Sequence, residues 1–230
     1  MTCSYGRRWK AFIIFVCCVL LAATLAAILL WDRLIAIWIN STASPALTQL
    51  AEVISIMGIP TIYFVPAAVA FLYYGPEKKH RLNRNRALFV LLNSTSAGLW
   101  ADMVKYLVGR SRPHLFLEHS IYGVHPLSNS WDFNSFPSDH AAVATAMAAT
   151  FWVLAPTYWP TYLLLAVIVC GCRILVGAHY LSDVLAGSLI GILAMLAFRA
   201  LFLQQGMELT TASVRTNRSH QWRGNSGSKE

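Results

Sequence analysis

Long apolar segments alternate with short polar stretches along most of the chain. A helix that spans a membrane needs about 20 mostly apolar residues. Six segments approach or exceed this length: 11–31, 49–74, 87–108, 138–155, 160–178 and 183–203. Pro60 and Pro66 interrupt the second segment, which predicts a kinked helix. The fourth segment is short and rich in alanine, which favours close packing among neighbouring helices. The pattern predicts an all-α bundle of six transmembrane helices.

The composition agrees with a multi-pass membrane protein. Hydrophobic residues make up 57% of the sequence, charged residues make up 12%, and the mean hydropathy is +0.52. The five cysteines are odd in number and four lie in apolar segments, which indicates small helix residues rather than a disulfide framework. The first apolar segment lacks a cleavage site and is expected to remain as a helix. We expect one membrane domain over 1–203 and a polar, disordered cytoplasmic tail over 204–230.

Lysine and arginine fall mainly on one side of the predicted bundle, and cytoplasmic segments carry the excess of these residues. That side holds 13 of the 18 basic residues, in the N-terminal segment, the loop around 78–86 and the C-terminal segment. The other five are Arg33, Lys105, Arg110, Arg112 and Arg173. Both termini are therefore predicted to be cytoplasmic, in an inner membrane. The formal net charge of +8 follows from this topology, and nucleic-acid binding is not needed to explain it.

Three polar clusters meet on the predicted outer or periplasmic side. They are KYLVGRSRP (105–113) after the third segment, PSDH (137–140) opening the fourth, and CRILVGAHYLSD (172–183) between the fifth and the sixth. Charged groups beside lipid are costly and by default indicate function. Lys105, Arg112 and Arg173 can surround an oxyanion, and the start of the fourth helix adds free backbone N–H groups. Together the clusters predict a phosphate site.

A histidine and an aspartate add a nucleophile to this site. His179 and Asp183 are four residues apart, so on a helix they share a face and the carboxylate can hold the imidazole in one tautomer. An imidazole oriented in this way is a candidate nucleophile. Arg110 is either a second phosphate contact or an interfacial anchor. Asp102 either pairs with Lys105 across a helix turn or is a buried polar group that faces the bundle.

Three further histidines belong to a long outer loop rather than to the motifs. His114, His119 and His125 share this loop with Trp131 and Phe133. Aromatic residues gather where a membrane meets water. We therefore interpret the loop as an interfacial segment that lines the path of a lipid to the site, and we assign these histidines no catalytic role.

The order and spacing of the motifs resemble the signature of the type 2 phosphatidic acid phosphatase superfamily. The motifs are Lys105, six residues, then Arg112-Pro113; Pro137-Ser138-x-His140; and Arg173, five residues, His179, three residues, Asp183. The resemblance covers about 87–203. It implies a metal-independent phosphatase without a cofactor. In such an enzyme, His179 would attack phosphorus to give a phosphohistidine, and Asp183 would orient His179. His140 would protonate the leaving oxygen and later help to activate water. The residues that would hold the phosphoryl oxygens are Lys105, Arg112, Ser138, Asp139 through its N–H, and Arg173.

Two positions depart from the usual pattern of that superfamily. Cys172 stands where a serine usually precedes the arginine, which predicts a weakened or missing hydrogen bond. Asp139 stands where a glycine usually precedes the histidine, and its carboxylate would repel an anionic substrate unless it turns toward a cation or caps the helix. The PSDH form is similar to that of the bacitracin-resistance type of undecaprenyl pyrophosphate phosphatase.

These observations leave three alternative functions. The first, which the similarity of the PSDH form favours, is hydrolysis of undecaprenyl pyrophosphate to undecaprenyl phosphate at the outer face. The second is the same chemistry on phosphatidylglycerophosphate, phosphatidate or a phosphate of lipid A. The third is a non-catalytic transporter or binder of anionic lipids, against which the complete set of nucleophile, acid and orienting carboxylate argues. The motifs do not separate the first two, because both substrates present a terminal phosphoryl group beside an apolar tail. The oligomeric state is left open.

Overall fold

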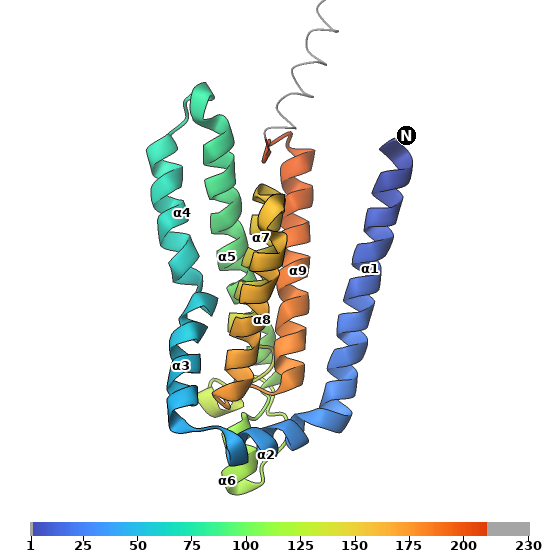
Figure 1. Cartoon of the computed structure of the whole chain (residues 1–230), viewed down its shortest axis with the longest axis vertical. Helices are drawn as coiled ribbons and strands as arrows, with labels where there is room; N and C mark the ends of the chain where they lie inside the picture. Colours follow the sequence, from blue (N-terminus) through green and yellow to red (C-terminus); the bar gives the residue numbers. More distant parts are fainter. Residues whose placement is uncertain (1, 211–230) are drawn as a thin grey trace, which may run out of the picture.

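The computed structural model describes residues 2–210, and within that range the regular secondary structure is helical. Figure 1 shows a bundle of long, nearly parallel helices. The longer helices, in chain order, are α1 (Thr2–Ala26), α2 (Asp32–Thr42), α3 (Pro45–Ser55), α4 (Pro60–Tyr74), α5 (Arg81–Val108), α6 (Pro113–His119), α7 (Asp139–Leu154), α8 (Trp159–Leu175) and α9 (Leu181–Gln204). The prediction of an all-α membrane fold is confirmed.

Five helical segments are long and apolar enough to cross a membrane, among the described residues. They are Ala11–Thr42, Pro45–Tyr74, Lys78–Val108, Pro156–Leu175 and Leu181–Gln204. The fourth predicted segment corresponds to α7, whose 16 residues are shorter than a typical span. The count of six therefore depends on α7, which packs against α5, α8 and α9 rather than standing apart.

Small residues bring α9 into backbone contact with α7. A Cβ atom at Gly187 would lie 2.2 Å from the carbonyl oxygen of Ser138, and one at Gly191 would lie 2.2 Å from that of Ala142. Neither glycine can be replaced without moving a helix, because the obstacle in each case is backbone. At the same contact, the Ser138 N–H donates to the carbonyl of Asp183 at 2.9 Å. This packing joins the start of α7 to the start of α9.

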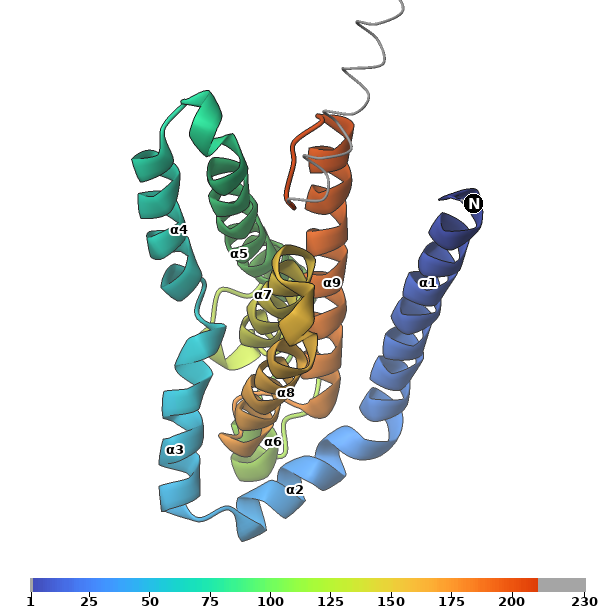
Figure 2. The same cartoon turned by 45° about the horizontal axis from the view of Figure 1, so that its top comes forward.

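The first apolar segment does not end where a simple spanning helix would. The α1 helix passes through a π-helical turn over Ala27–Trp31, and α2 then crosses the end of the bundle to reach α3 (Figure 2). Asp32 is the first residue of α2, and it is buried in the bundle. The sequence pattern did not predict this crossing helix. Its residues lie beyond the first predicted segment, 11–31, and before the second, 49–74.

The predicted break in the second segment lies just before Pro60. A short turn over Ile56–Gly58 separates α3 from α4, and Pro60 is the first residue of α4. Proline is well suited to this position, because the N–H of a first helical residue makes no hydrogen bond within the helix. Pro66 lies inside α4, which continues past it to Tyr74. Gly58 is required at the break, because a Cβ atom there would lie 2.8 Å from Cβ of His140.

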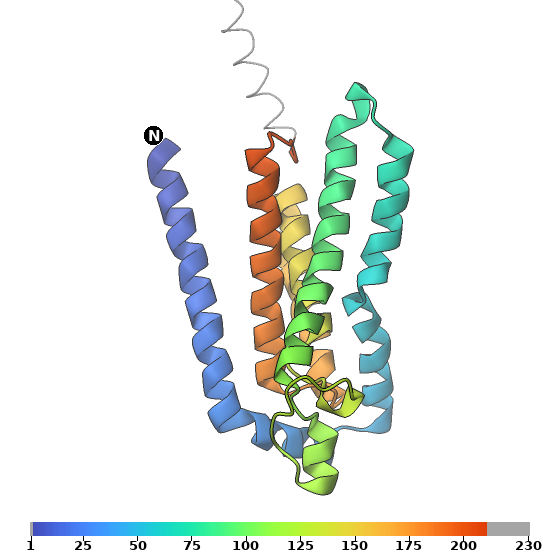
Figure 3. The ribbon, with the colours of Figure 1, turned by 180° about the vertical axis from the view of Figure 1, so that it is seen from behind.

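The two ends of the described chain share one end of the bundle. In Figure 3, the beginning of α1, the end of α9 and the connection between α4 and α5 lie together, while α2, α6 and the start of α9 lie at the opposite end. After α9 the chain folds back on α5: Asn85 and Arg86 donate to the carbonyls of Glu208 and Leu209, and Leu209 is buried. The predicted tail thus begins with a packed segment, and its residues 211–230 lie outside the described range.

Candidate active site

The three predicted clusters converge at the end of the bundle that also holds α2 and α6. Lys105 lies in the last turn of α5, Asp139 begins α7, and Arg173 lies in the last turn of α8. His179 follows in the connection to α9, and Asp183 lies in the first turn of α9. Lys105, His179 and Asp183 are buried, as expected for groups held at an internal site.

The imidazole of His179 is held in one tautomer. Its Nδ1 lies 2.8 Å from the carbonyl oxygen of Ser135, which only accepts hydrogen bonds, so Nδ1 carries the proton. Within the described residues, Nε2 is buried and has no hydrogen-bond partner. Burial lowers the pKa of His179 to about 4, opposed by the nearby Asp183 carboxylate. The ring is therefore neutral at neutral pH, and the lone pair of Nε2 has no hydrogen-bond donor beside it among the described residues.

Asp183 is fixed on three sides. Its Oδ1 accepts from Arg110 at 2.6 Å, and its Oδ2 accepts from Ser135 Oγ at 2.6 Å and from the Tyr180 N–H at 2.8 Å. The distance from Oδ2 to His179 Nδ1 is 3.8 Å, too long for a hydrogen bond. Ser135 instead contacts both side chains, through its carbonyl and its hydroxyl. The sequence motifs did not indicate this serine, which lies three residues before Ser138.

Asp139 occupies the centre of the cationic cluster. Its Oδ1 lies 2.8 Å from Lys105 Nζ, 3.3 Å from His140 Nδ1 and 3.9 Å from His179 Nε2. The carboxylate has turned toward a cation, one of the two arrangements that the sequence allowed for an acid at this position. It also contacts the side chains that the motifs assign to phosphate binding and chemistry. Oδ1 of Asp102 also lies 3.8 Å from Lys105 Nζ. Of the two alternatives for Asp102, the structure therefore shows the pair with Lys105 across a helix turn.

Arg112 and Arg173 differ in their contacts. Arg112 donates to the carbonyls of Trp131, Ala178 and Asn134 at 2.9, 2.9 and 3.3 Å, and its guanidinium lies 4.2 Å from the centre of the Trp131 ring. Burial lowers the pKa of Arg112. Arg173, by contrast, has a buried Nε without a hydrogen-bond partner in the described structure. A buried guanidinium N–H without an acceptor is costly, which favours an anion beside Arg173.

Ser138 caps α7, as its place before the helix predicts. Its side chain accepts from the Ala141 N–H at 3.4 Å, and the residue is completely buried. The start of a helix carries free N–H groups and the positive end of the helix dipole, which attract anions. Cys172 is also buried, in α8.

Arg110 matches neither of its two predicted roles. It lies between two buried carboxylates, Asp183 at 2.6 Å and Asp32 at 2.8 Å, and stacks over the ring of Tyr180 at 4.5 Å. The two acids raise the pKa of Arg110 despite its burial. The motif analysis missed Asp32, although an acid inside an apolar segment was a signal that could have revealed it.

The three histidines of the outer loop lie outside this cluster. His114 stacks on Trp131, His125 packs against Phe133, and the side chain of His119 is 59% exposed. Among residues 2–210, no group of three or more histidine, cysteine, aspartate or glutamate side chains is arranged to hold a metal ion.

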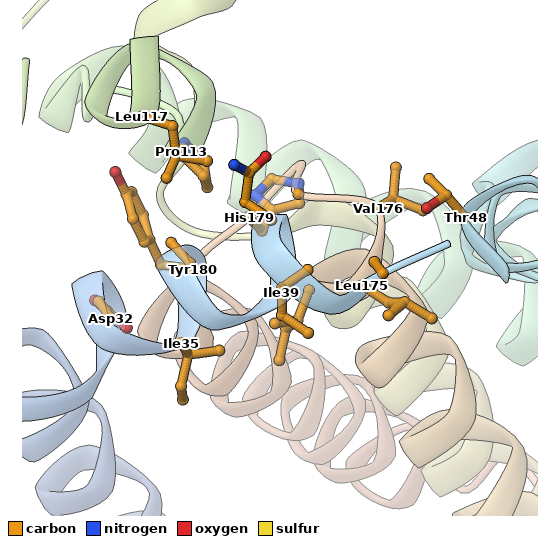
Figure 4. A pocket seen from close by; sticks show the side chains of 15 residues that line it. Asp32, Ile35, Ile39, Thr48, Pro113, Leu117, Leu175, Val176, His179 and Tyr180 are labelled. Atoms are coloured by element: carbon orange, nitrogen blue, oxygen red, sulfur yellow. The ribbon is translucent and has the colours of Figure 1, made fainter. Parts of the chain in front are cut away.

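A cavity of about 210 Å³ reaches the site from the side of α2 (Figure 4). Its walls come from α2, α3, α6 and the connection between α8 and α9, and they include Ile35, Ile39 and Leu117. His179 and Tyr180 also line it, whereas the three motif cations do not. The cavity therefore meets the imidazole from a side that is lined mainly by apolar residues.

The structure combines apolar helices long enough to cross a membrane with a cluster of buried charged groups at one end of the bundle. Residues 86–206 match the model of the PAP2 superfamily, and the chain belongs to that superfamily. The chain is therefore a lipid phosphatase, which is a hydrolase of phosphate esters, and a multi-pass membrane protein. The resemblance read from the motifs is confirmed at the level of the superfamily.

Named relatives act on different lipids. The chain is 28% identical over 211 residues to a lipid A 1-phosphatase of Rhizobium johnstonii, covering 87% of this chain and 83% of that protein. It is 28% identical over 109 residues to an undecaprenyl-diphosphatase of Sulfolobus acidocaldarius, covering 47% and 51%. A transmembrane PAP2-type phosphatidylglycerolphosphate phosphatase from Bacillus subtilis has a similar fold, with a TM-score of 0.54, 20% identity, and coverage of 85% and 94%.

Proposed function

We propose that the chain removes a terminal phosphate from a membrane lipid through a phosphohistidine at His179, and that its preferred substrate is a phosphate monoester of lipid A. The observation that carries the mechanism is the state of the His179 ring. Its Nδ1 proton is engaged by the Ser135 carbonyl, while its Nε2 has no partner among the described residues and lies 3.9 Å from the Asp139 carboxylate. A neutral, oriented imidazole with one free nitrogen is suited to nucleophilic attack.

Two displacements at phosphorus complete the reaction. In the first, His179 Nε2 forms a bond to phosphorus while the bond to the lipid oxygen breaks, and His140 gives its proton to that oxygen. In the second, water attacks the phosphohistidine, His140 accepts a proton from the water, and the phosphorus–nitrogen bond breaks to release phosphate and restore His179. Asp183 would stabilise the imidazole while it carries the phosphoryl group and positive charge.

The phosphoryl oxygens would be held by Lys105, Arg112 and Arg173, together with the N–H groups at the start of α7. The Asp139 carboxylate now pairs with Lys105 at 2.8 Å, so a substrate phosphate must displace it to reach that cation. Such an exchange replaces one anion by another and keeps Lys105 neutralised. It also explains how an acid can be tolerated at a position next to an anionic substrate.

Similarity to the lipid A 1-phosphatase, which extends over most of both chains, supports the lipid A substrate. Undecaprenyl pyrophosphate is the second candidate, supported by the PSDH form of the second motif and by the shorter match to the undecaprenyl-diphosphatase. The PSDH form favours this second substrate, whereas the longer match favours lipid A, and we place lipid A first for that reason.

We further propose that the site faces the outer or periplasmic side of the inner membrane and that both termini are cytoplasmic. The clustering of 13 of 18 basic residues supports this orientation. The fold is consistent with it, because the basic connection between α4 and α5 lies at the same end as the start of α1 (Figure 1).

The test is phosphate release by the purified, full-length protein from a panel of lipids, measured with and without chelator. The panel contains lipid A, undecaprenyl pyrophosphate, phosphatidylglycerophosphate and phosphatidate. We expect the highest kcat/KM for lipid A, insensitivity to chelator, and acid-labile phosphate on His179 after rapid quenching. Preference for undecaprenyl pyrophosphate would reverse the substrate order. Binding of these lipids without release of phosphate from any of them would instead support the non-catalytic alternative.

A further inference from the structure

Asp32 is an acid buried at the joint between the first two helices. It follows the π-helical turn over Ala27–Trp31, and its side chain is completely buried. Two contacts fix it to α9: its Oδ1 accepts from the Ser182 N–H at 3.0 Å, and its Oδ2 accepts from the Ser182 hydroxyl. Insertions of a π turn are frequent at functional sites, because they redirect a side chain that a regular helix would place elsewhere.

Arg110 connects this acid to the candidate site. Its Nη2 lies 2.8 Å from Asp32 Oδ2, and its Nη1 lies 2.6 Å from Asp183 Oδ1 and 2.6 Å from Ser182 Oγ. One buried guanidinium is thus shared by two buried carboxylates, one at the start of α2 and one at the start of α9. A buried charge keeps a fixed geometry only when its partners surround it on more than one side.

The contacts continue from Asp183 to the imidazole. Ser135 donates to Asp183 Oδ2 at 2.6 Å, and its carbonyl accepts from His179 Nδ1 at 2.8 Å. The orientation of His179 therefore depends on Ser135, whose hydroxyl depends on Asp183. Asp183 in turn has Arg110 as its cationic partner. Asp32 lies at the far end of this series, 78 residues before Arg110 and outside the segment that matches the superfamily model.

We propose that Asp32 is a positioning residue of the phosphatase site. It holds Arg110 against Asp183 and thereby keeps Ser135 and the His179 tautomer in place, without touching the substrate. This inference rests on the proposed nucleophilic role of His179. The alternative is that Asp32 only anchors α2 to α9, in which case its loss would lower stability and leave the chemistry of the folded protein unchanged.

The test compares Asp32→Asn, Arg110→Gln and the double variant in the full-length protein, purified in the same detergent. Asparagine keeps the size of the side chain and removes its charge. We expect Asp32→Asn to lower kcat at least tenfold per folded molecule with KM within twofold of wild type. The double variant should lose no more than Arg110→Gln alone, because both changes interrupt one connection. Glu118→Gln, at an exposed acid on α6, is the matched control and should leave kcat unchanged.

A second measurement does not depend on turnover. The ¹⁵N spectrum of labelled histidine, assigned with His179→Gln, should show the Nδ1-protonated tautomer of His179 in the wild type and a mixture of tautomers in Asp32→Asn. If the wild type releases phosphate from no lipid, the proposed function fails, but this spectrum still tests the positioning role. Retention of both kcat and the single tautomer in folded Asp32→Asn would overturn the inference.

Ser182→Ala covers the case in which Asp32→Asn does not fold. It removes the hydroxyl that contacts both Asp32 and Arg110 and leaves every charge in place. We expect kcat to fall threefold or more, again with little change in KM. A folded Ser182→Ala protein with wild-type kcat and an unchanged His179 tautomer would contradict the proposed connection between Asp32 and the site.

Discussion

Lys105 and Asp139 form an ion pair at the centre of the candidate site, with Nζ and Oδ1 2.8 Å apart. The same carboxylate oxygen lies 3.9 Å from Nε2 of His179, the proposed nucleophile. An internal anion thus lies where the proposed mechanism places the phosphate of the substrate. The identity of residue 139 should therefore affect which phosphates the enzyme prefers.

Replacing Asp139 by glycine should favour monoesters over pyrophosphates. The change frees Lys105, on which a monoester depends strongly. A pyrophosphate carries a second phosphoryl group that can pair with the other cations. The ratio of kcat/KM for a lipid monophosphate to that for undecaprenyl pyrophosphate should rise by about fivefold to tenfold, which corresponds to a difference of about 1 kcal/mol. A ratio that stays constant over several pH values would limit Asp139 to a role in opening the helix.

The effect of losing His140 should depend on the leaving group, whereas the effect of losing His179 should not. His179→Ala should abolish turnover of every substrate, because no phosphohistidine can form. His140→Ala should reduce turnover of a lipid monophosphate by about 10²-fold to 10⁴-fold, the usual contribution of a general acid, and should affect an aryl phosphate least. Parallel assays with the two substrates measure this difference. Equal losses for both in His140→Ala would exclude its role as the acid.

The burial of His179 should make the protein less stable in acid. Its pKa is lowered from 6.5 to about 4, so the unfolded chain binds more protons between these values, and stability falls as the pH drops through this range. The shift corresponds to a loss of about 3 kcal/mol in the free energy of unfolding once the pH lies below both pKa values. His179→Gln should therefore lose less in Tm between pH 7 and pH 4.5 than the wild type does. His119→Gln, at an exposed position, is the control. A parallel fall of Tm in wild type and His179→Gln would show that His179 is not the group responsible.

The contact between α7 and α9 should tolerate no side chain at Gly187. A Cβ atom there meets the Ser138 carbonyl, so Gly187→Ala must push α9 away from α7 and separate Ser138 from Asp183. We expect a loss of stability of about 1–3 kcal/mol, typical of overpacking, and a lower kcat. Gly171→Ala on α8, where a Cβ atom meets nothing within 4 Å, is the matched control. Equal Tm and kcat values in the two variants would contradict this account of the packing.

The orientation in the membrane can be tested with reporter fusions. Fusions in the 75–86 loop should report a cytoplasmic location, and fusions near residue 123, in the outer loop, should report the opposite side. The expectation follows from the excess of lysine and arginine in the first of these loops. A periplasmic signal from the 75–86 loop would reverse the topology and move the site to the cytoplasmic face.

The sequence by itself determined the class of protein, the approximate positions of the five long apolar helical segments and the order of the motif residues. Apolar length is a local property, so these segments could be predicted from it, and the order of Lys105, Arg112, His140, His179 and Asp183 identified the superfamily. The break at Pro60 could also be predicted, since proline and the residue before it constrain the local backbone.

Only the tertiary structure decided which buried charges are partners. Arg110 pairs with Asp32 because a π turn and the crossing helix α2 bring the start of that helix against α9, and no local pattern reports such a turn. Asp139 pairs with Lys105 because α5 and α7 end and begin at the same level of the bundle. Ser135 contacts both His179 and Asp183 from an irregular loop. Pairing in the interior depends on distances between segments far apart in the sequence, and those distances are set by helix packing.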